Sequence, residues 1–225
     1  MSPEAKKDPK ANETTQYSPD WIREEVSRLV ELHESGTMPS IVQLGHPVLR
    51  MQAVDHAEQL GEKLLRRFLD TMKAVMLDAP GVGLAAPQLG VPLRIAVLED
   101  LYETSPEIAA ARQREPLEYL EIINPRYYPV GERMAEFYEG CLSFNGYQGV
   151  VVRPSDITTS FTDVYGRARE RLFSGWQARI FQHETDHLDG IVYIDKALSR
   201  SLCSSLEYAR WANPDVDQAR RGLDF

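Results

Sequence analysis

The sequence predicts an α+β fold, in which small antiparallel sheets pack around a central helix, with N-terminal helices and a C-terminal helix. Helical patterns occupy the first third of the chain, and short strand-like runs follow them. Another helical pattern, at residues 174–190, comes after these strands and must pack on them. The 225 residues are enough for one hydrophobic core, so we expect a single domain at 18–212.

The N-terminal part of the chain is expected to contain an extension and two helices. Residues 1–17 are polar and lack an apolar stretch, which predicts a disordered extension rather than a signal peptide. Ser18-Pro19 is typical of a helix start, and this helix should end near Gly36. The second helix should run up to Pro80-Gly81. The apolar faces are Ile22, Val26, Leu29 and Val30 in the first helix, and Leu60, Leu64, Phe68, Met72, Val75 and Met76 in the second.

The middle and the end of the chain alternate between strand-like runs and charged segments. The stretch Glu99–Glu118 reads as an inserted loop with room for a short helix. A final helical pattern covers Ala197–Trp211, and residues 213–225 read as a polar tail. The expected strands are Arg94–Leu98, Tyr119–Asn124, Val150–Val152, Ile157–Asp163 and Ala168–Phe173.

The helical pattern after the strands contains the segment QHETDH, at residues 182–187. In a helix His183 and His187 stand one turn apart on the same face, with about 6 Å between their β-carbons. Two imidazoles at that spacing can bind one divalent metal ion, and Glu184 beside them can take a proton from a bound water. The alternative is an amphipathic helix whose histidines meet no metal.

The ends of this helix are also marked in the sequence. Ser174 and Gln177 predict a capping box at its start, and Gly190 predicts its C-terminal stop. The apolar residues available to bury the segment are Trp176, Ile180, Phe181 and Leu188.

The chain has two cysteines, Cys141 and Cys203. Two histidines leave a tetrahedral metal in need of a third protein ligand and an open position for water. Cys141 lies in EGCLS, between strand-like and turn-like sequence rather than in an apolar core run, so we expect it to be that ligand. Cys203 lies in a helical pattern and reads as a small buried residue.

A glycine-rich segment, GVGLAAPQLG, spans Gly81–Gly90. It formally matches the dinucleotide fingerprint, but that motif needs a strand before it and a helix after it. Here a helical pattern precedes the segment, and Pro87 with a short strand follows, which excludes nucleotide binding. The segment instead predicts a tight loop whose backbone approaches a ligand, with the Gln88 amide available to a developing oxyanion.

The segments GVGLAAPQLG, EGCLS and QHETDHLDG, in this order, resemble those of peptide deformylases, and the likeness to actinobacterial-type members covers about 41–194. These enzymes remove the N-formyl group from the initiator methionine of new bacterial and organellar proteins. The resemblance therefore implies that 18–212 is a single catalytic metallohydrolase domain whose substrate is an N-formyl-methionyl peptide.

The resemblance implies a metal site made of Cys141, His183 and His187, with Glu184 as the acid–base residue. It implies one divalent metal ion per chain, typically ferrous iron (Fe2+), with zinc (Zn2+), nickel (Ni2+) or cobalt (Co2+) as substitutes. A Cys/His/His set alone would indicate zinc.

The resemblance also implies which groups bind the substrate. The Gln88 side chain and the Leu142 backbone N–H would stabilise the tetrahedral oxyanion. Core packing is an equally good reading for two of the residues that would contact the peptide, Leu84 and Ile180. The implied substrate-binding residues are Gly83, Leu84, Gly140 and Ile180.

The chain departs from the family pattern after EGCLS. Many members continue with Val/Ile-Pro and soon an arginine, whereas residues 144–148 here are FNGYQ. A substrate contact through an arginine at Gln148 is therefore in doubt. We hypothesise that Arg153 instead pairs with Glu139 and braces the cysteine loop.

Two alternative functions remain open on the sequence. The segment 183–193 follows the metzincin frame, with Tyr193 where the third histidine belongs, which is compatible with a zinc endopeptidase of the HExxH type. Gly81–Gly90 and Glu139–Ser143 have no place in that scheme. The second alternative is a catalytically silent, metal-binding or ribosome-associated paralogue, against which the presence of Glu184 argues.

The composition limits which binding partners and which cellular compartment are expected. A net charge of −9 disfavours nonspecific nucleic-acid binding, so no DNA partner is expected. The sequence has no membrane-spanning stretch, and a cysteine needed as a thiolate indicates the reducing cytoplasm. Arg210, Arg220 and Arg221 form a weak basic cluster that could touch the ribosome near the exit tunnel, although a solvated tail is the better reading.

Overall fold

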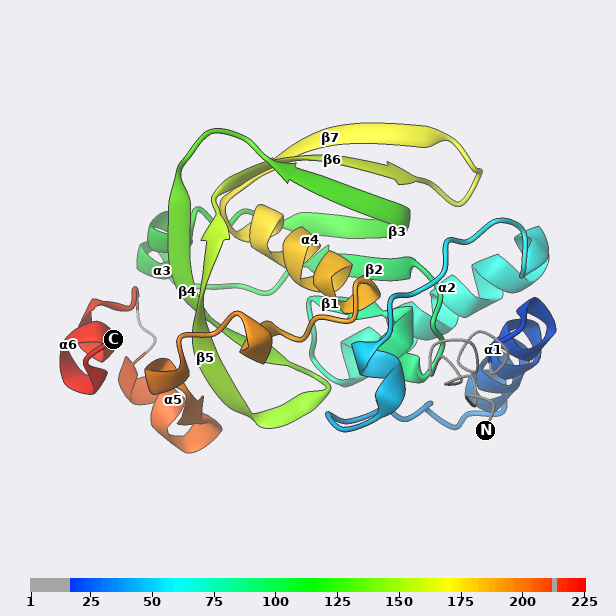
Figure 1. The fold of residues 1–225 in the computed structure, drawn as a ribbon, viewed down its shortest axis with the longest axis horizontal. Helices are drawn as coiled ribbons and strands as arrows, with labels where there is room; N and C mark the ends of the chain where they lie inside the picture. The colour runs from blue at the N-terminus through cyan, green and yellow to red at the C-terminus, as the bar shows by residue number, and fades with distance from the viewer. Residues whose placement is uncertain (1–16, 212–213) are drawn as a thin grey trace, which may run out of the picture.

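The computed structural model describes residues 17–211 and 214–225, so the predicted extension, apart from Tyr17, lies outside the described residues. Two antiparallel sheets are present, and helix α4 (Gly175–Leu188) lies against both of them in the middle of the molecule (Figure 1). The predicted α+β fold, with small antiparallel sheets around a central helix, is confirmed.

The larger sheet has the strand order β1-β2-β3-β6-β7, and the smaller has the order β4-β5-β8. All of these pairings are antiparallel. The strands are β1 (Gly83–Ala85), β2 (Ile95–Asp100), β3 (Leu117–Pro129), β4 (Met134–Cys141), β5 (Phe144–Pro154), β6 (Asp156–Thr162), β7 (Ala168–Ser174) and β8 (Cys203–Ser204). Short 3-10 helices lie in the connections at Pro47–Arg50, Ala86–Leu89, Tyr193–Asp195 and Ser199–Ser201.

The two N-terminal helices are α1 (Pro19–Glu34) and α2 (Gly61–Asp78). The Ser18 side chain accepts the Trp21 backbone N–H at 3.2 Å, as expected of an N-cap before proline. The predicted apolar faces pack together and onto β1 and β2, where they form one continuous core. This core holds the glycine-rich loop in place, because Leu84, Ala86 and Leu89 belong to it.

Helix α4 begins differently from the prediction. Ser174 is the N-cap but its side chain makes no capping bond, so the predicted capping box is wrong. Gln177 instead donates to the Pro116 carbonyl at 2.8 Å. Gly175 has φ +58, and a Cβ there would lie 2.5 Å from the Gln113 carbonyl oxygen, so this turn requires glycine. The predicted stop is confirmed, since Gly190, with φ +74, comes directly after the C-cap residue Asp189.

Other elements differ in extent. The inserted loop contains helix α3 (Pro106–Arg112), and β3 and β5 are several residues longer than predicted. The predicted helix over Ala197–Trp211 is wrong in its first half, because Cys203 lies in β8 and only α5 (Ser205–Trp211) is helical, and the predicted polar tail contains α6 (Asp217–Leu223). Val216 and Ala219 are buried against the small sheet, which explains why the tail is helical. No helix within the described ranges combines the length and apolarity needed to cross a membrane.

Candidate active site

Three predicted ligands meet where the end of β4 approaches α4. Cys141 is the last residue of β4, and one ligand atom from each of Cys141, His183 and His187 lies within 4.8 Å of the others. Cys141 Sγ is 3.2 Å from His187 Nε2, and the two imidazole rings are 5.1 Å apart. One soft thiolate and two imidazoles at this spacing fit a single divalent transition-metal ion.

The remaining nitrogen of His183 is held by a buried carboxylate. His183 Nδ1 lies 2.9 Å from Glu139 Oε2, which leaves Nε2 to face the other ligands. Glu139 accepts two hydrogen bonds from Arg153, at 2.6 and 2.9 Å, and one from Arg179 at 2.5 Å. Burial opposes its ionisation, but Arg153 and Arg179 hold the pKa of Glu139 well below its usual value.

The network extends from Arg153 to Asp186, which lies about one turn further along α4 than His183. Arg153 donates to Asp186 at 2.7 Å, and Asp186 also accepts from Lys196 and from the Tyr127 hydroxyl at 3.0 Å. The predicted pairing of Arg153 with Glu139 is confirmed as a contact. Its effect on the cysteine loop remains a prediction.

The three ligand side chains shift one another's pKa values. Burial raises the pKa of Cys141, but the neighbouring His187 and His183 outweigh it and bring this pKa to about 5. Burial disfavours a charged His183, while hydrogen bonds to Cys141 and Glu139 raise its pKa well above 6.5. A thiolate and an imidazole nitrogen that compete for one proton form a site that favours a metal cation.

Glu184 lies beside the ligands with its carboxylate buried. The residue is 4% exposed, and Oε2 has no hydrogen-bond partner among the described residues. Burial raises the pKa of Glu184 above its usual value, against the opposing effect of His183 and His187. A buried carboxylate with a raised pKa is suited to take and return a proton near neutral pH.

Gln88 reaches the site from the glycine-rich loop. Its Oε1 accepts the Ala85 backbone N–H at 2.8 Å, which turns the amide nitrogen towards Cys141 Sγ (3.6 Å) and Ser143 Oγ (3.4 Å). The backbone N–H of Ser143 points to the same sulfur, at 3.3 Å. Leu142, between them, lines the same cavity.

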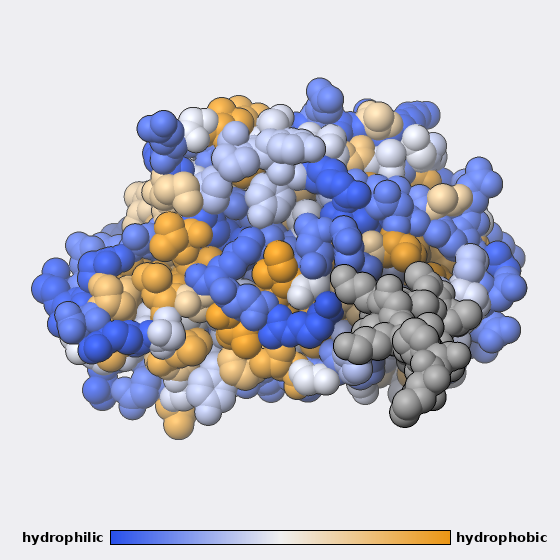
Figure 2. Space-filling view, viewed as in Figure 1, coloured by the Kyte–Doolittle hydropathy of each residue, from blue (hydrophilic) through white to orange (hydrophobic). Residues whose placement is uncertain are grey.

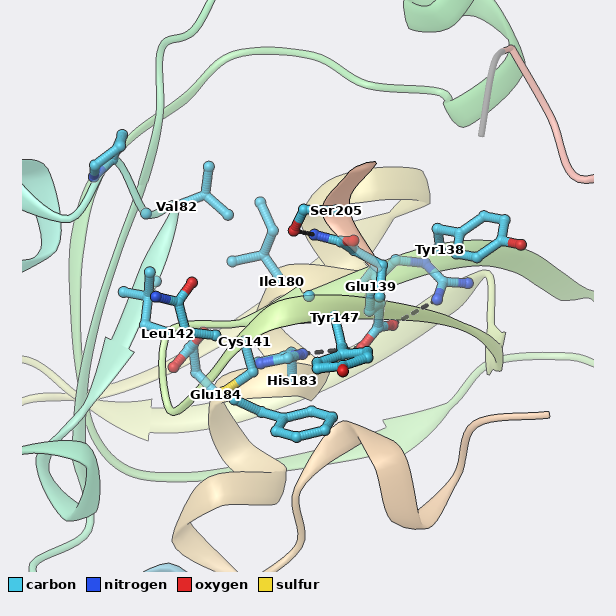
Figure 3. A pocket seen from close by; sticks show the side chains of 18 of the residues that line it. Val82, Tyr138, Glu139, Cys141, Leu142, Tyr147, Ile180, His183, Glu184 and Ser205 are labelled. Carbon is cyan, nitrogen blue, oxygen red and sulfur yellow. Dashed lines mark hydrogen bonds and ion pairs between the residues drawn. The ribbon is translucent and has the colours of Figure 1, made fainter. Parts of the chain in front are cut away.

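A cavity of about 370 Å³ adjoins these groups (Figure 3). It brings together most of the predicted site residues, while His187 lies behind them and is 1% exposed. Leu84 does not line the cavity and is fully buried in the core, which agrees with the core-packing interpretation of this residue. Val82 lines the cavity from the same loop instead. The predicted residues on the cavity wall are Gly83, Gln88, Gly140, Cys141, Leu142, Ile180, His183 and Glu184.

Other cavity residues were not predicted. Arg112 comes from the inserted helix α3, and its guanidinium lies 4.9 Å from the Trp176 ring. Ser205 and Tyr208 come from α5. No local sequence motif marks these three residues as part of a binding site, because only the tertiary fold brings them to the cavity.

The departure at residues 144–148 builds part of the same wall. Phe144 and Tyr147 stack with ring centroids 5.3 Å apart. Gln148 donates to Ser205 Oγ at 3.2 Å. Tyr193, the third ligand in the endopeptidase alternative, donates its hydroxyl to the Tyr147 carbonyl at 3.0 Å, so the metzincin reading loses its third ligand.

Comparison with known proteins gives a consistent result. Residues 38–202 match the model of the polypeptide deformylase family. "Peptide deformylase 3" of Streptomyces avermitilis is 46% identical over 219 residues, which cover 96% of this chain and 98% of the relative. The peptide deformylase of Bifidobacterium adolescentis is 46% identical over 206 residues, covering 91% and 94%. Both are actinobacterial relatives.

Solved structures agree. A class I type b peptide deformylase from Acinetobacter baumannii with Met-Ala-Ser bound has a TM-score of 0.63 at 28% identity, covering 71% of this chain and 98% of that one. One from Synechococcus elongatus in complex with actinonin has a TM-score of 0.60 at 33% identity, covering 72% and 81%. The chain therefore belongs to the polypeptide deformylase family, the metal-dependent hydrolases that remove the N-formyl group from nascent polypeptides.

Proposed function

We propose that this deformylase works with one divalent metal ion held by Cys141, His183 and His187, and with Glu184 as the group that moves the proton. The observation that carries the proposal is the convergence of three ligand atoms within 4.8 Å beside a buried carboxylate oxygen that has no partner among the described residues. The endopeptidase and silent-paralogue alternatives have no support in the comparisons.

The donor set fits the proposed metal. A thiolate and two imidazoles fill three positions and leave one for catalysis. When bound, such an ion acts as a Lewis acid that lowers the pKa of a coordinated water to about 7 and polarises a carbonyl. We propose ferrous iron, with zinc, nickel or cobalt as substitutes, on the resemblance to the family rather than on the ligand types.

Glu184 would act as base and then as acid within one cycle. Its carboxylate takes a proton from the attacking water as the new C–O bond forms at the formyl carbon. It then returns this proton to the methionine nitrogen as the C–N bond breaks, which gives formate and a free N-terminal amine. The raised pKa of Glu184 supports both roles, because the group can hold the proton between the two steps.

Gln88 and the Leu142 backbone N–H would stabilise the oxyanion. Because Ala85 fixes the Gln88 carbonyl oxygen, the amide N–H₂ is already oriented towards Cys141 and needs little reorganisation during the reaction. Removing one such donor typically costs on the order of 10²–10³ in turnover.

The substrate would lie along the cavity. We propose that the backbones of Gly83 and Gly140 contact the peptide and that Ile180 and Val82 contact the methionine side chain, since all four line the cavity. We place the enzyme in the cytoplasm, where thiolate ligands stay reduced.

We also propose a transient contact with the ribosome near the exit tunnel, where formylated chains emerge. Within the basic cluster, Arg210 pairs with Glu207 and Arg220 pairs with Glu136.

The test is formate release from a formyl-Met tripeptide. Protein purified anaerobically with ferrous iron or nickel is compared with Glu184→Ala, and the metal content of both is measured. We expect rapid release that is lost in the variant while the metal is retained. No release from folded, metal-loaded wild-type protein would overturn the proposal, and cleavage of an unformylated internal peptide bond would favour the endopeptidase.

A further inference from the structure

The cavity has a wall built by a segment outside the family match. The match ends at residue 202, yet Ser205 and Tyr208 line the cavity together with the metal ligands. We propose that β8 and the start of α5 form a recognition wall for the substrate residues that follow formyl-methionine. This inference rests on the proposed function and assigns a new role to the C-terminal segment.

The wall is held firmly against the small sheet. β8 pairs with β5 through Tyr147↔Ser204 and Gln148↔Cys203. The amide of Gln148 donates to the Ser205 hydroxyl at 3.2 Å, which ties the first residue of α5 to the strand that follows the cysteine loop. Because these residues are already ordered on a β-strand, binding a ligand costs little additional conformational entropy.

Tyr208 is fixed from the other side. Its ring packs edge-on against Tyr138, with centroids 5.6 Å apart and an interplanar angle of 80°. Tyr138 is 2% exposed and belongs to the apolar cluster beneath α5 and α6. Tyr208 itself is half-buried and presents a preordered aromatic surface to the cavity.

The wall lies across the cavity from the catalytic groups. In Figure 3, Ser205 and Tyr138 stand on one side and Cys141 and Glu184 on the other, with Ile180 between them. Since the formyl group must lie at Cys141 and Glu184, the wall is within reach of later parts of the substrate.

Exposure identifies which part of the substrate the wall would meet. Ser205 is exposed, Tyr147 is 48% exposed and the adjacent Leu206 is 92% exposed. Apolar side chains gather on the face shown in Figure 2 over β5 and next to α5. A methionine side chain is suited to a closed apolar pocket, whereas a long polypeptide has to leave through an open side. We therefore assign the wall to the downstream residues.

The chemistry of the wall is neutral. An amide, a hydroxyl and aromatic rings can hydrogen-bond to and pack against a peptide backbone, but they offer no charge to select acidic or basic side chains. The expected preference is thus for the length of the peptide rather than for the charge of the residue after formyl-methionine.

The test compares two substrates, formyl-Met-Ala and formyl-Met-Ala-Ser-Ala, with nickel-loaded protein. The measured quantity is the ratio of kcat/KM for the long substrate to that for the short one. Ser205→Ala and Tyr208→Ala should each lower this ratio about fivefold, mainly through KM, which is the size of one neutral hydrogen bond or aromatic contact. Ser205 is exposed, so its variant should fold normally.

Glu207→Ala is the matched control, because Glu207 lies on the same helix, pairs with Arg210 and does not line the cavity. It should keep the wild-type ratio. An unchanged ratio in both test variants would overturn the inference, as would altered discrimination between formyl-methionine and formyl-norleucine at constant length. Absence of formate release from both substrates by wild-type protein would instead contradict the proposed function.

Discussion

The Glu184 carboxylate lies directly against the α-carbon of Gly83. A Cβ on residue 83 would be 2.3 Å from Glu184 Oε1 and 2.7 Å from its Cγ, so only a hydrogen atom fits there. Glu184 is 4% exposed and its backbone is fixed on α4, so a larger residue 83 would push the carboxylate out of its present position. The position of Glu184 on the helix that carries His183 and His187 therefore requires glycine at residue 83 of the glycine-rich loop.

Gly83→Ala should displace Glu184 while the metal ligands stay in place. We expect kcat for formyl-Met-Ala to fall on the order of 10²-fold, since general acid–base catalysis contributes about that much or more. Metal content, measured by elemental analysis, should remain at the wild-type level. Gly81→Ala is the comparison, because the closest contact of its Cβ would be the flexible end of the Leu142 side chain, at 2.8 Å, with no backbone atom nearer than 3.4 Å, and the loss should be milder. Near-wild-type kcat in Gly83→Ala would refute the displacement.

Glu139→Gln should weaken metal binding. The carboxylate orients His183 through Nδ1. Loss of such a partner typically lowers metal affinity by roughly 10–100-fold. Competition with a chelator measures the change. Glu136→Gln is a matched control on the same strand, because Glu136 pairs with Arg220 rather than with a ligand. Equal chelator resistance in the two variants would show that Glu139 does not support the ligand.

The catalytic residues could be predicted because each lies in a short contiguous motif. His183, Glu184 and His187 are positioned by one helical turn, and Cys141 ends a strand beside a turn. The buried charges around them could be predicted only in part. Glu139, Arg153 and Arg179 are nearly inaccessible, but a charged residue in sequence normally indicates a surface.

The parts that the sequence did not reveal depend on tertiary contacts. Leu84 lies in β1 and is buried in the core, whereas Val82 precedes the strand and lines the cavity, and only the tertiary packing of this loop separates the two. The sequence of β4 does not alternate between apolar and polar residues, and its burial does not alternate either, so its pattern resembles a loop. Ser205 and Tyr208 reach the cavity because β8 pairs with β5, a contact that no local pattern encodes.

Arg153→Ala should destabilise the fold. Arg153 is 1% exposed and neutralises Glu139 and Asp186, so its loss leaves buried carboxylates with less compensation. Breaking a buried pair in this way costs about 3–5 kcal/mol, which denaturant unfolding can measure. Arg133→Ala removes an exposed pair with Asp156 and should cost no more than about 1 kcal/mol. Unchanged metal retention and activity in Arg153→Ala would contradict its role as a brace of the cysteine loop.

His56 should make the protein less stable in mild acid. Burial lowers the pKa of His56 below its usual 6.5, and its Nε2 has no hydrogen-bond partner among the described residues. The unfolded chain then binds the proton more readily than the folded one, so stability is unaffected above 6.5 and falls as the pH drops below it. His56→Gln should therefore lose less free energy of unfolding than the wild type between about pH 7 and 5. Urea unfolding of both proteins measures this difference, and every other titrating group, the metal ligands included, is common to the two. Parallel pH dependence in the two proteins would contradict the assignment.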